Sequence, residues 1–124
     1  MKNKILVVED DFLLVRLYKR AFELEGYEVE TAYGGEEALE KLKSLEKKPD
    51  LILLDIVMPR INGLDLLREI KKDPAIKNIP VVVFTNISEK KEEDEAMSLG
   101  ASMYLLKGEL DIKDVLQKIC PLIK

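Results

Sequence analysis

The chain contains no histidine and no tryptophan, and its only cysteine is Cys120. Without histidine, Ser-His-Asp and Cys-His triads, histidine metal ligands and acid–base catalysis by imidazole are all excluded. A single cysteine also excludes an internal disulfide and a CxxC site. We expect Cys120 to fill space near the end of a helix, as a small apolar side chain does.

A strong excess of one charge and a long apolar run are also missing. The 124 residues carry 20 Lys and Arg against 24 Asp and Glu, a net charge of -4, and this balance disfavours a direct nucleic-acid partner. No apolar run is long enough to span a bilayer, so we expect no membrane-embedded part. The first apolar run, residues 5–8, is too short for the core of a signal peptide, which favours a cytoplasmic protein.

Short apolar runs alternate with helical patterns throughout the chain. Predicted strands cover residues 5–8, 28–32, 51–54, 81–84 and 103–106, and predicted helices follow at about 14–22, 38–45, 64–70, 89–99 and 112–119. Five β–α pairs predict an α/β fold with a parallel sheet covered by helices on both faces. Nothing marks an internal boundary, so we expect a single domain over residues 1–124.

Polar residues follow four of the five predicted strands. Glu9 and Asp10 follow the first, Asp55 the third, Thr85 the fourth and Lys107 the fifth. In doubly wound sheets ligands bind outside the carboxyl ends of the strands. The strand order 2-1-3-4-5, known from other doubly wound proteins, would bring all of these side chains to one edge.

This group of residue types suits phosphoryl transfer. Crowded carboxylates repel one another unless a cation intervenes, and ligands limited to oxygen suit a hard ion such as Mg²⁺. An aspartate can accept a phosphoryl group, and a lysine can pair with a phosphoryl oxygen. Each residue alone also has an ordinary structural explanation, and Asp11 is better explained as a helix cap than as a ligand. Together the residues favour the functional interpretation.

The sequence resembles the receiver domain of two-component response regulators, in its chemotaxis-regulator-like single-domain form. The resemblance covers essentially the whole chain and is carried by residues 5–10, 55–63 and 100–107 together with Thr85. The most specific segment runs from Asp55 through Pro59 to Asn62-Gly63. The resemblance implies a flavodoxin-like (βα)5 fold with the strand order 2-1-3-4-5.

The resemblance also implies a role for each site residue. Asp55 would be the phosphoacceptor, and Mg²⁺ would be bound by Asp10, by Asp55 and by the main-chain carbonyl of Val57. Glu9 would act on the metal through water.

The remaining implied roles concern the switch and the partners. Thr85 would hold the phosphoryl group, Lys107 would pair with Asp55 or its phosphate, and Tyr104 would be the switch aromatic. The phosphoryl donor would be a histidine kinase or a His-phosphotransfer protein. The downstream target would bind the face formed by the fourth helix, fifth strand and fifth helix, and a homodimer stays open.

Two departures from the family pattern support an alternative. Gly108 stands where a proline usually follows the lysine, and Asn86 stands where a small residue is usual. These support a pseudo-receiver that binds partners without being phosphorylated. Because a cis bond before a non-proline residue costs about 2.5–4 kcal/mol, we expect Lys107–Gly108 to be trans. An Asp-nucleophile phosphatase ranks last, because such enzymes usually carry a second aspartate two positions after the nucleophile, and Val57 occupies that place. We expect no enzyme activity beyond slow autophosphatase activity.

Overall fold

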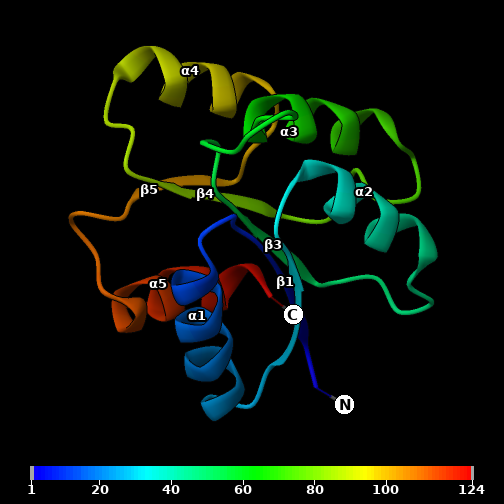
Figure 1. The fold of residues 1–124 in the computed structure, drawn as a ribbon, viewed down its shortest axis with the longest axis vertical. Helices are drawn as coiled ribbons and strands as arrows, with labels where there is room; N and C mark the ends of the chain where they lie inside the picture. Colours follow the sequence, from blue (N-terminus) through cyan, green and yellow to red (C-terminus); the bar gives the residue numbers. More distant parts are fainter. Residues whose placement is uncertain (1, 124) are drawn as a thin grey trace.

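The computed structural model describes residues 2–123. Five parallel strands form one sheet in the order β2-β1-β3-β4-β5 (Figure 1), which confirms the predicted α/β, flavodoxin-like fold and its strand order. The strands are β1 (Lys4–Val8), β2 (Glu28–Ala32), β3 (Leu51–Leu54), β4 (Val81–Thr85) and β5 (Met103–Leu106). The predicted single domain stays a prediction, and its first and last residues lie outside the described range.

Five helices cover the two faces of this sheet. They are α1 (Phe12–Leu24), α2 (Gly35–Ser44), α3 (Gly63–Lys72), α4 (Lys90–Ser98) and α5 (Ile112–Ile119), and a 3-10 turn, η1 (Cys120–Leu122), follows α5. Helices α1 and α5 lie on one face, while α2, α3 and α4 lie side by side on the other (Figure 1). No helix among residues 2–123 is long and apolar enough to cross a bilayer.

The apolar strands explain this three-layer arrangement. Every residue of β1, β3 and β4 is buried, as expected for strands covered on both faces. Alternate side chains point to opposite faces and supply two separate cores. Leu6 and Leu54 belong to the core beneath α2, α3 and α4, whereas Ile5 and Leu53 belong to the core beneath α1 and α5.

The structure also corrects two details of the sequence interpretation. Cys120 is exposed, so it does not fill space in the core. The apolar residues Leu14, Leu17, Tyr18, Ala21 and Phe22 recur at helical spacing, which predicts that they share the buried face of α1, but Leu17 is 57% exposed. The buried stripe of α1 consists instead of Val15, Tyr18 and Phe22.

Polar caps fix the beginnings of the helices beside the sheet edge. The Asp11 carboxylate accepts hydrogen bonds from the N–H groups of Leu13 (2.9 Å) and Leu14 (3.3 Å), which confirms its expected role as a cap. Asn62 caps α3 by accepting from the N–H of Asp65 at 2.9 Å. These caps place the starts of α1 and α3 next to the residues that follow β1 and β3.

Gly63 at the start of α3 lies against the backbone that follows β3. A Cβ atom at this position would be 2.4 Å from the Cα of Ile56 and 2.5 Å from the carbonyl oxygen of Asp55. Only glycine allows the helix to begin this close to Asp55.

We therefore expect Gly63→Ala to lower the free energy of unfolding by about 3 kcal/mol, because the added methyl group meets backbone that has no room to move. Urea denaturation monitored by circular dichroism measures this change. The matched control is Gly108→Ala, since a Cβ at Gly108 would meet no atom within 4 Å. Equal stability of the two variants would contradict the steric explanation.

Candidate functional site

The candidate site lies at the carboxyl ends of β1, β3 and β5. The Asp55 N–H donates to the carbonyl of Val8 at 3.0 Å, and the Lys107 N–H donates to the carbonyl of Thr85 at 2.8 Å. These bonds extend the sheet pairing one residue beyond the strand ends. They hold the backbones of Asp55 and Lys107 in place independently of any side-chain contact.

Lys107 joins two carboxylates that come from different strands. Its Nζ donates to Oδ2 of Asp55 at 3.0 Å and to Oε1 of Glu9. All three side chains are nearly buried, with exposed fractions of 11% for Lys107, 3% for Glu9 and 8% for Asp55. Burial alone would lower the pKa of Lys107, but the hydrogen bond that it donates to Glu9 and the charge of Asp55 outweigh burial and raise that pKa. The lysine is therefore an ammonium ion at neutral pH.

The acidic side chains form a cluster that can hold a metal ion. One carboxylate oxygen from each of Glu9, Asp10 and Asp55 lies within 4.8 Å of the others. Asp10 is exposed, while Glu9 and Asp55 are buried. Three carboxylates without sulfur or imidazole form a donor set that suits a hard divalent cation. The geometry fits the expected metal site.

One further hydrogen bond orients the Asp55 carboxylate. Its Oδ1 accepts from the N–H of Val57 at 3.1 Å, while Oδ2 faces Lys107. Asp55 is thus held from both sides, and its rotamer is fixed before any ligand arrives. The Val57 side chain is 53% exposed, and the expected use of its carbonyl as a ligand stays a prediction.

A surface cavity surrounds these groups. Its lining consists of Glu9, Asp10, Asp11, Leu14, Asp55, Val57, Asn86 and Lys107. Five of the sequence-predicted site residues therefore share one cavity, whereas Thr85 and Tyr104 do not line it.

Thr85 and Tyr104 meet instead at the backbone of one intervening residue, Ile87. Thr85 is fully buried, and its hydroxyl accepts from the N–H of Ile87 at 3.3 Å. The Tyr104 hydroxyl donates to the carbonyl of Ile87 at 2.7 Å. The two predicted switch residues are therefore connected through Ile87, and the sequence carries no signal for this link.

Leu14 and Asn86 also line the cavity. Leu14 belongs to the helical spacing of apolar residues in α1, and no sequence motif marks it as a site residue. Asn86 stands out in the sequence because it replaces a small residue, and the structure places it, exposed, at the cavity. The peptide bonds of residues 2–123 are all trans, so the expectation of a trans Lys107–Gly108 bond is confirmed.

Comparisons with known proteins agree with this geometry. A family model described as the response regulator receiver domain matches residues 5–119. The chain therefore belongs to the response regulator receiver domain family of two-component signalling.

Particular relatives refine this assignment. The chain is 42% identical over 105 residues to a transcriptional regulatory protein CpxR homolog of Haemophilus influenzae, a match that covers 85% of this chain and 44% of the relative. It is 34% identical over 107 residues to the polar-differentiation response regulator DivK of Brucella anthropi, covering 86% of this chain and 85% of DivK. The chain thus spans about half the length of several curated relatives and most of the length of DivK.

Solved structures show the same fold along the whole chain. The chemotaxis protein CheY4 of Vibrio cholerae has a TM-score of 0.90 and 25% identity, covering 99% of this chain and 100% of that one. A CheY-like receiver domain protein of Methanospirillum hungatei has a TM-score of 0.89 and 29% identity, covering 98% of this chain and 93% of that one.

The buried position of Lys107 between two carboxylates generates a stability prediction. Lys107→Met leaves Glu9 and Asp55 buried without their counter-charge, and we expect the free energy of unfolding to fall by roughly 3 kcal/mol. Chemical denaturation without added divalent cations measures this decrease in the free energy of unfolding. The control is Lys19→Met, because the Lys19–Glu23 pair is exposed and contributes about 0.5 kcal/mol. Equal losses in both variants would show that Lys107 does not stabilise the site.

Proposed function

We propose that this chain is a phosphoacceptor switch in which Asp55 takes a phosphoryl group from a phosphohistidine donor. A bond forms between the phosphorus and a carboxylate oxygen of Asp55 while the phosphorus–nitrogen bond of the donor breaks, and imidazole leaves. The observation that supports this most directly is the fixed Asp55 carboxylate, held by Lys107 at 3.0 Å and by the Val57 N–H at 3.1 Å. Positioning and charge neutralisation supply most of the catalysis of phosphoryl transfer.

Magnesium would complete the site. Asp10, Asp55 and the Val57 carbonyl would hold the ion, and Glu9 would act through a water molecule, because its own oxygens already accept from Lys107 and from the Asp11 N–H. When bound, Mg²⁺ neutralises charge on the phosphoryl oxygens. The Lys107 ammonium, fixed beside Asp55, would pair with a phosphoryl oxygen on the same side.

The effect of phosphorylation at Asp55 would be transmitted to the surface through Thr85. A phosphoryl oxygen at Asp55 offers a charged acceptor for the Thr85 hydroxyl, which now accepts from the Ile87 N–H. A change at Ile87 also affects the Tyr104 hydroxyl, because that group donates to the Ile87 carbonyl. Tyr104 belongs to β5, so the signal arrives at the face formed by α4, β5 and α5. We propose this face as the docking site for a downstream target in the cytoplasm.

A second candidate function is a pseudo-receiver that binds partners without phosphorylation. Gly108 and Asn86 favour this pseudo-receiver, because both depart from the family pattern. Gly108 directly follows Lys107, and Asn86 lines the cavity. The complete set of Asp10, Asp55 and Lys107 favours the phosphoacceptor. A chemical phosphoryl donor separates the two functions.

We expect incubation with acetyl phosphate and Mg²⁺ to add the mass of one PO₃ group, measured by intact mass spectrometry. Asp55→Asn removes the acceptor oxygen and should abolish labelling, and EDTA should suppress labelling of the unmodified chain. No added mass would favour the pseudo-receiver, and label retained by Asp55→Asn would exclude Asp55 as the acceptor.

A matched pair of variants tests the metal in the same assay. Asp10→Asn removes a predicted ligand and should raise the Mg²⁺ concentration required for labelling by about tenfold or more. Asp11→Asn makes the same charge change one residue along, and asparagine caps a helix as well as aspartate does. The Asp11 variant should therefore keep the unmodified requirement.

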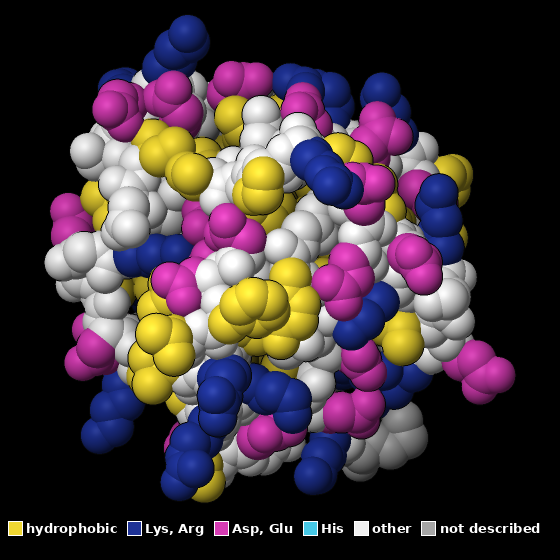
Figure 2. Space-filling model, in the orientation of Figure 1, with side chains coloured by type: hydrophobic (Ala, Val, Ile, Leu, Met, Phe, Trp, Pro, Cys, Tyr) yellow, Lys and Arg dark blue, Asp and Glu magenta, His cyan; other side chains and the backbone are white. Residues whose placement is uncertain are grey.

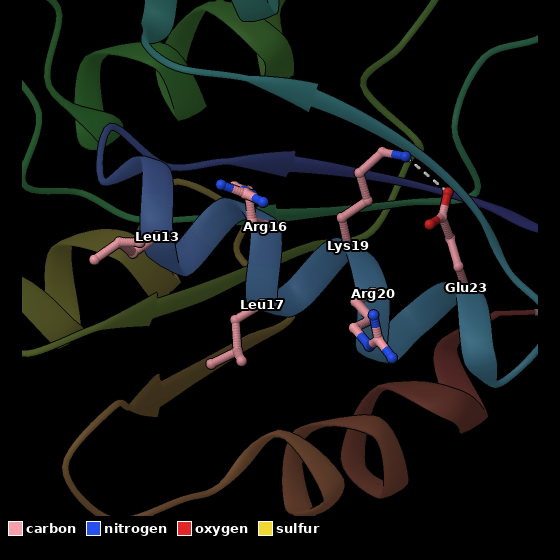
Figure 3. A pocket seen from close by; sticks show the side chains of 6 residues that line it. All are labelled: Leu13, Arg16, Leu17, Lys19, Arg20 and Glu23. Atoms are coloured by element: carbon pink, nitrogen blue, oxygen red, sulfur yellow. Dashed lines mark hydrogen bonds and ion pairs between the residues drawn. The ribbon is translucent and has the colours of Figure 1, made fainter.

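The outer surface of α1 suggests where the donor binds. Leu13, Leu17 and Leu24 are 77%, 57% and 74% exposed, on the side opposite the buried stripe. Together with Arg20 they follow the 4-3-4 spacing of a helix-packing seam. Figure 3 shows the leucine side chains at 13 and 17 extending from α1, with Arg16 and Arg20 beside them.

Charge and position indicate a particular kind of partner. No carboxylate in residues 2–123 forms an ion pair with Arg16 or Arg20, and Figure 2 shows basic side chains next to exposed apolar ones over α1. Two copies of this chain would bring their arginines together, whereas an acidic amphipathic helix would match the seam. Because α1 begins beside Asp10, a helix along it would lie next to the phosphoacceptor. We assign this face to the helical phosphodonor.

Leu17→Glu should therefore slow transfer from a phosphorylated histidine kinase that labels the unmodified chain, by about tenfold, because it places a charge in an apolar contact. Labelling by acetyl phosphate should not change, since Leu17 does not line the cavity. The control is Met97→Glu on the outer surface of α4, where Met97 is 43% exposed. Equal transfer rates in the two variants would contradict donor docking on α1.

A further inference from the structure

Helix α4 is the helix most weakly attached to the sheet. Ala96 is its only buried residue, and its N-cap Glu89 makes no side-chain capping bond. By contrast, α1, α3 and α5 each have a side-chain cap and at least two buried residues. The first turn of α4 therefore has little apolar contact to hold it in place.

Glu92 in this first turn has an unusual environment. Its Oε2 atom is buried and has no hydrogen-bond partner, and it is the only such side-chain atom in residues 2–123. Two later acids of α4 do have partners: Asp94 pairs with Lys90 at 3.4 Å and Glu95 with Arg68 at 3.1 Å. Glu92 occupies the third helical position, from which a glutamate can bond back to the cap residue, but no such bond forms.

The charge of Glu92 acts on the Tyr104 hydroxyl. Burial raises the pKa of Tyr104 to about 12, and the charge of Glu92 is the next largest cause. The Tyr104 hydroxyl is already committed to the Ile87 carbonyl at 2.7 Å, so it does not serve the Glu92 oxygen. We call this state, with Tyr104 bonded to Ile87 and α4 packed against β5, the closed arrangement.

We propose that Glu92 opposes the closed arrangement and so keeps the start of α4 close to balance between two positions. Burying a carboxylate oxygen without a partner costs free energy, which is recovered when the first turn moves away from β5 and the oxygen returns to water. This role deepens the proposed switch and rests on it for its biological meaning. The destabilisation itself is a property of the unphosphorylated chain.

Hydrogen exchange of the unphosphorylated chain tests the proposal. Glu92→Met keeps a long, helix-compatible side chain but has no polar atom to leave unpaired. Amides of residues 93–96, the first with hydrogen-bond acceptors in α4, should become about tenfold more protected than in the unmodified chain, and the thermal midpoint should rise. The matched control is Glu93→Met, because Glu93 is the exposed neighbour on the same helix and makes the same charge change. This variant should leave protection unchanged.

A second variant separates charge from hydrogen bonding. Glu92→Gln removes the charge but keeps a polar group that needs partners, so its protection should lie between those of the unmodified chain and Glu92→Met. Protection of Glu92→Met equal to or below that of Glu93→Met would overturn the proposal. Acetyl phosphate labelling of Asp55 is measured separately, so failure of the phosphoacceptor function and failure of the Glu92 role give different results.

Discussion

The site depends on one interaction, the contact of a buried ammonium ion with two buried carboxylates. Lys107 reaches Asp55 and Glu9 at once, and none of the three side chains has much access to water. An acid pair buried this way would repel strongly without the lysine, and the lysine would be costly to bury without the acids. The interaction therefore fixes the Asp55 carboxylate beside a positive charge, an arrangement that suits the proposed phosphoacceptor role.

The parallel sheet is what makes this interaction available. Lys107 is 52 residues from Asp55 and 98 residues from Glu9, so no local structure could bring the three together. Because β1, β3 and β4 run in the same direction side by side, and β5 joins β4, the residues after each strand meet at one edge. Gly63 contributes from the other side, since only a glycine lets α3 begin against the Asp55 carbonyl. The core that supports the sheet thus also sets the geometry of the site.

The sequence was informative where chemistry is local and periodic, and less so where it depends on tertiary contacts. The β2, β3 and β5 bounds match the predicted ranges, because apolar runs and turn residues are local signals. The grouping of Glu9, Asp10 and Asp55 followed from strand order. The exposure of Leu17 could not be predicted, because helical spacing alone does not show which apolar residues of α1 face the sheet. The connection between Thr85 and Tyr104 uses the backbone N–H and carbonyl of Ile87. Because nearly every residue has these groups, the sequence does not predict the connection.

Rigidity is distributed unequally over the molecule, and this distribution suits the proposed switch. The Asp55 side is held by sheet bonds, by helix caps and by the ion pair with Lys107, so that the Asp55 carboxylate keeps one position. The β4–α4 side is held by few apolar contacts, and one of its buried oxygens lacks a partner. In the proposed switch, a small change at Thr85 would therefore move the weakly held element and not the site, because displacement follows the lowest local stability. A fold with a uniformly packed second face would bind a phosphoryl group equally well but would transmit little of that event to its surface.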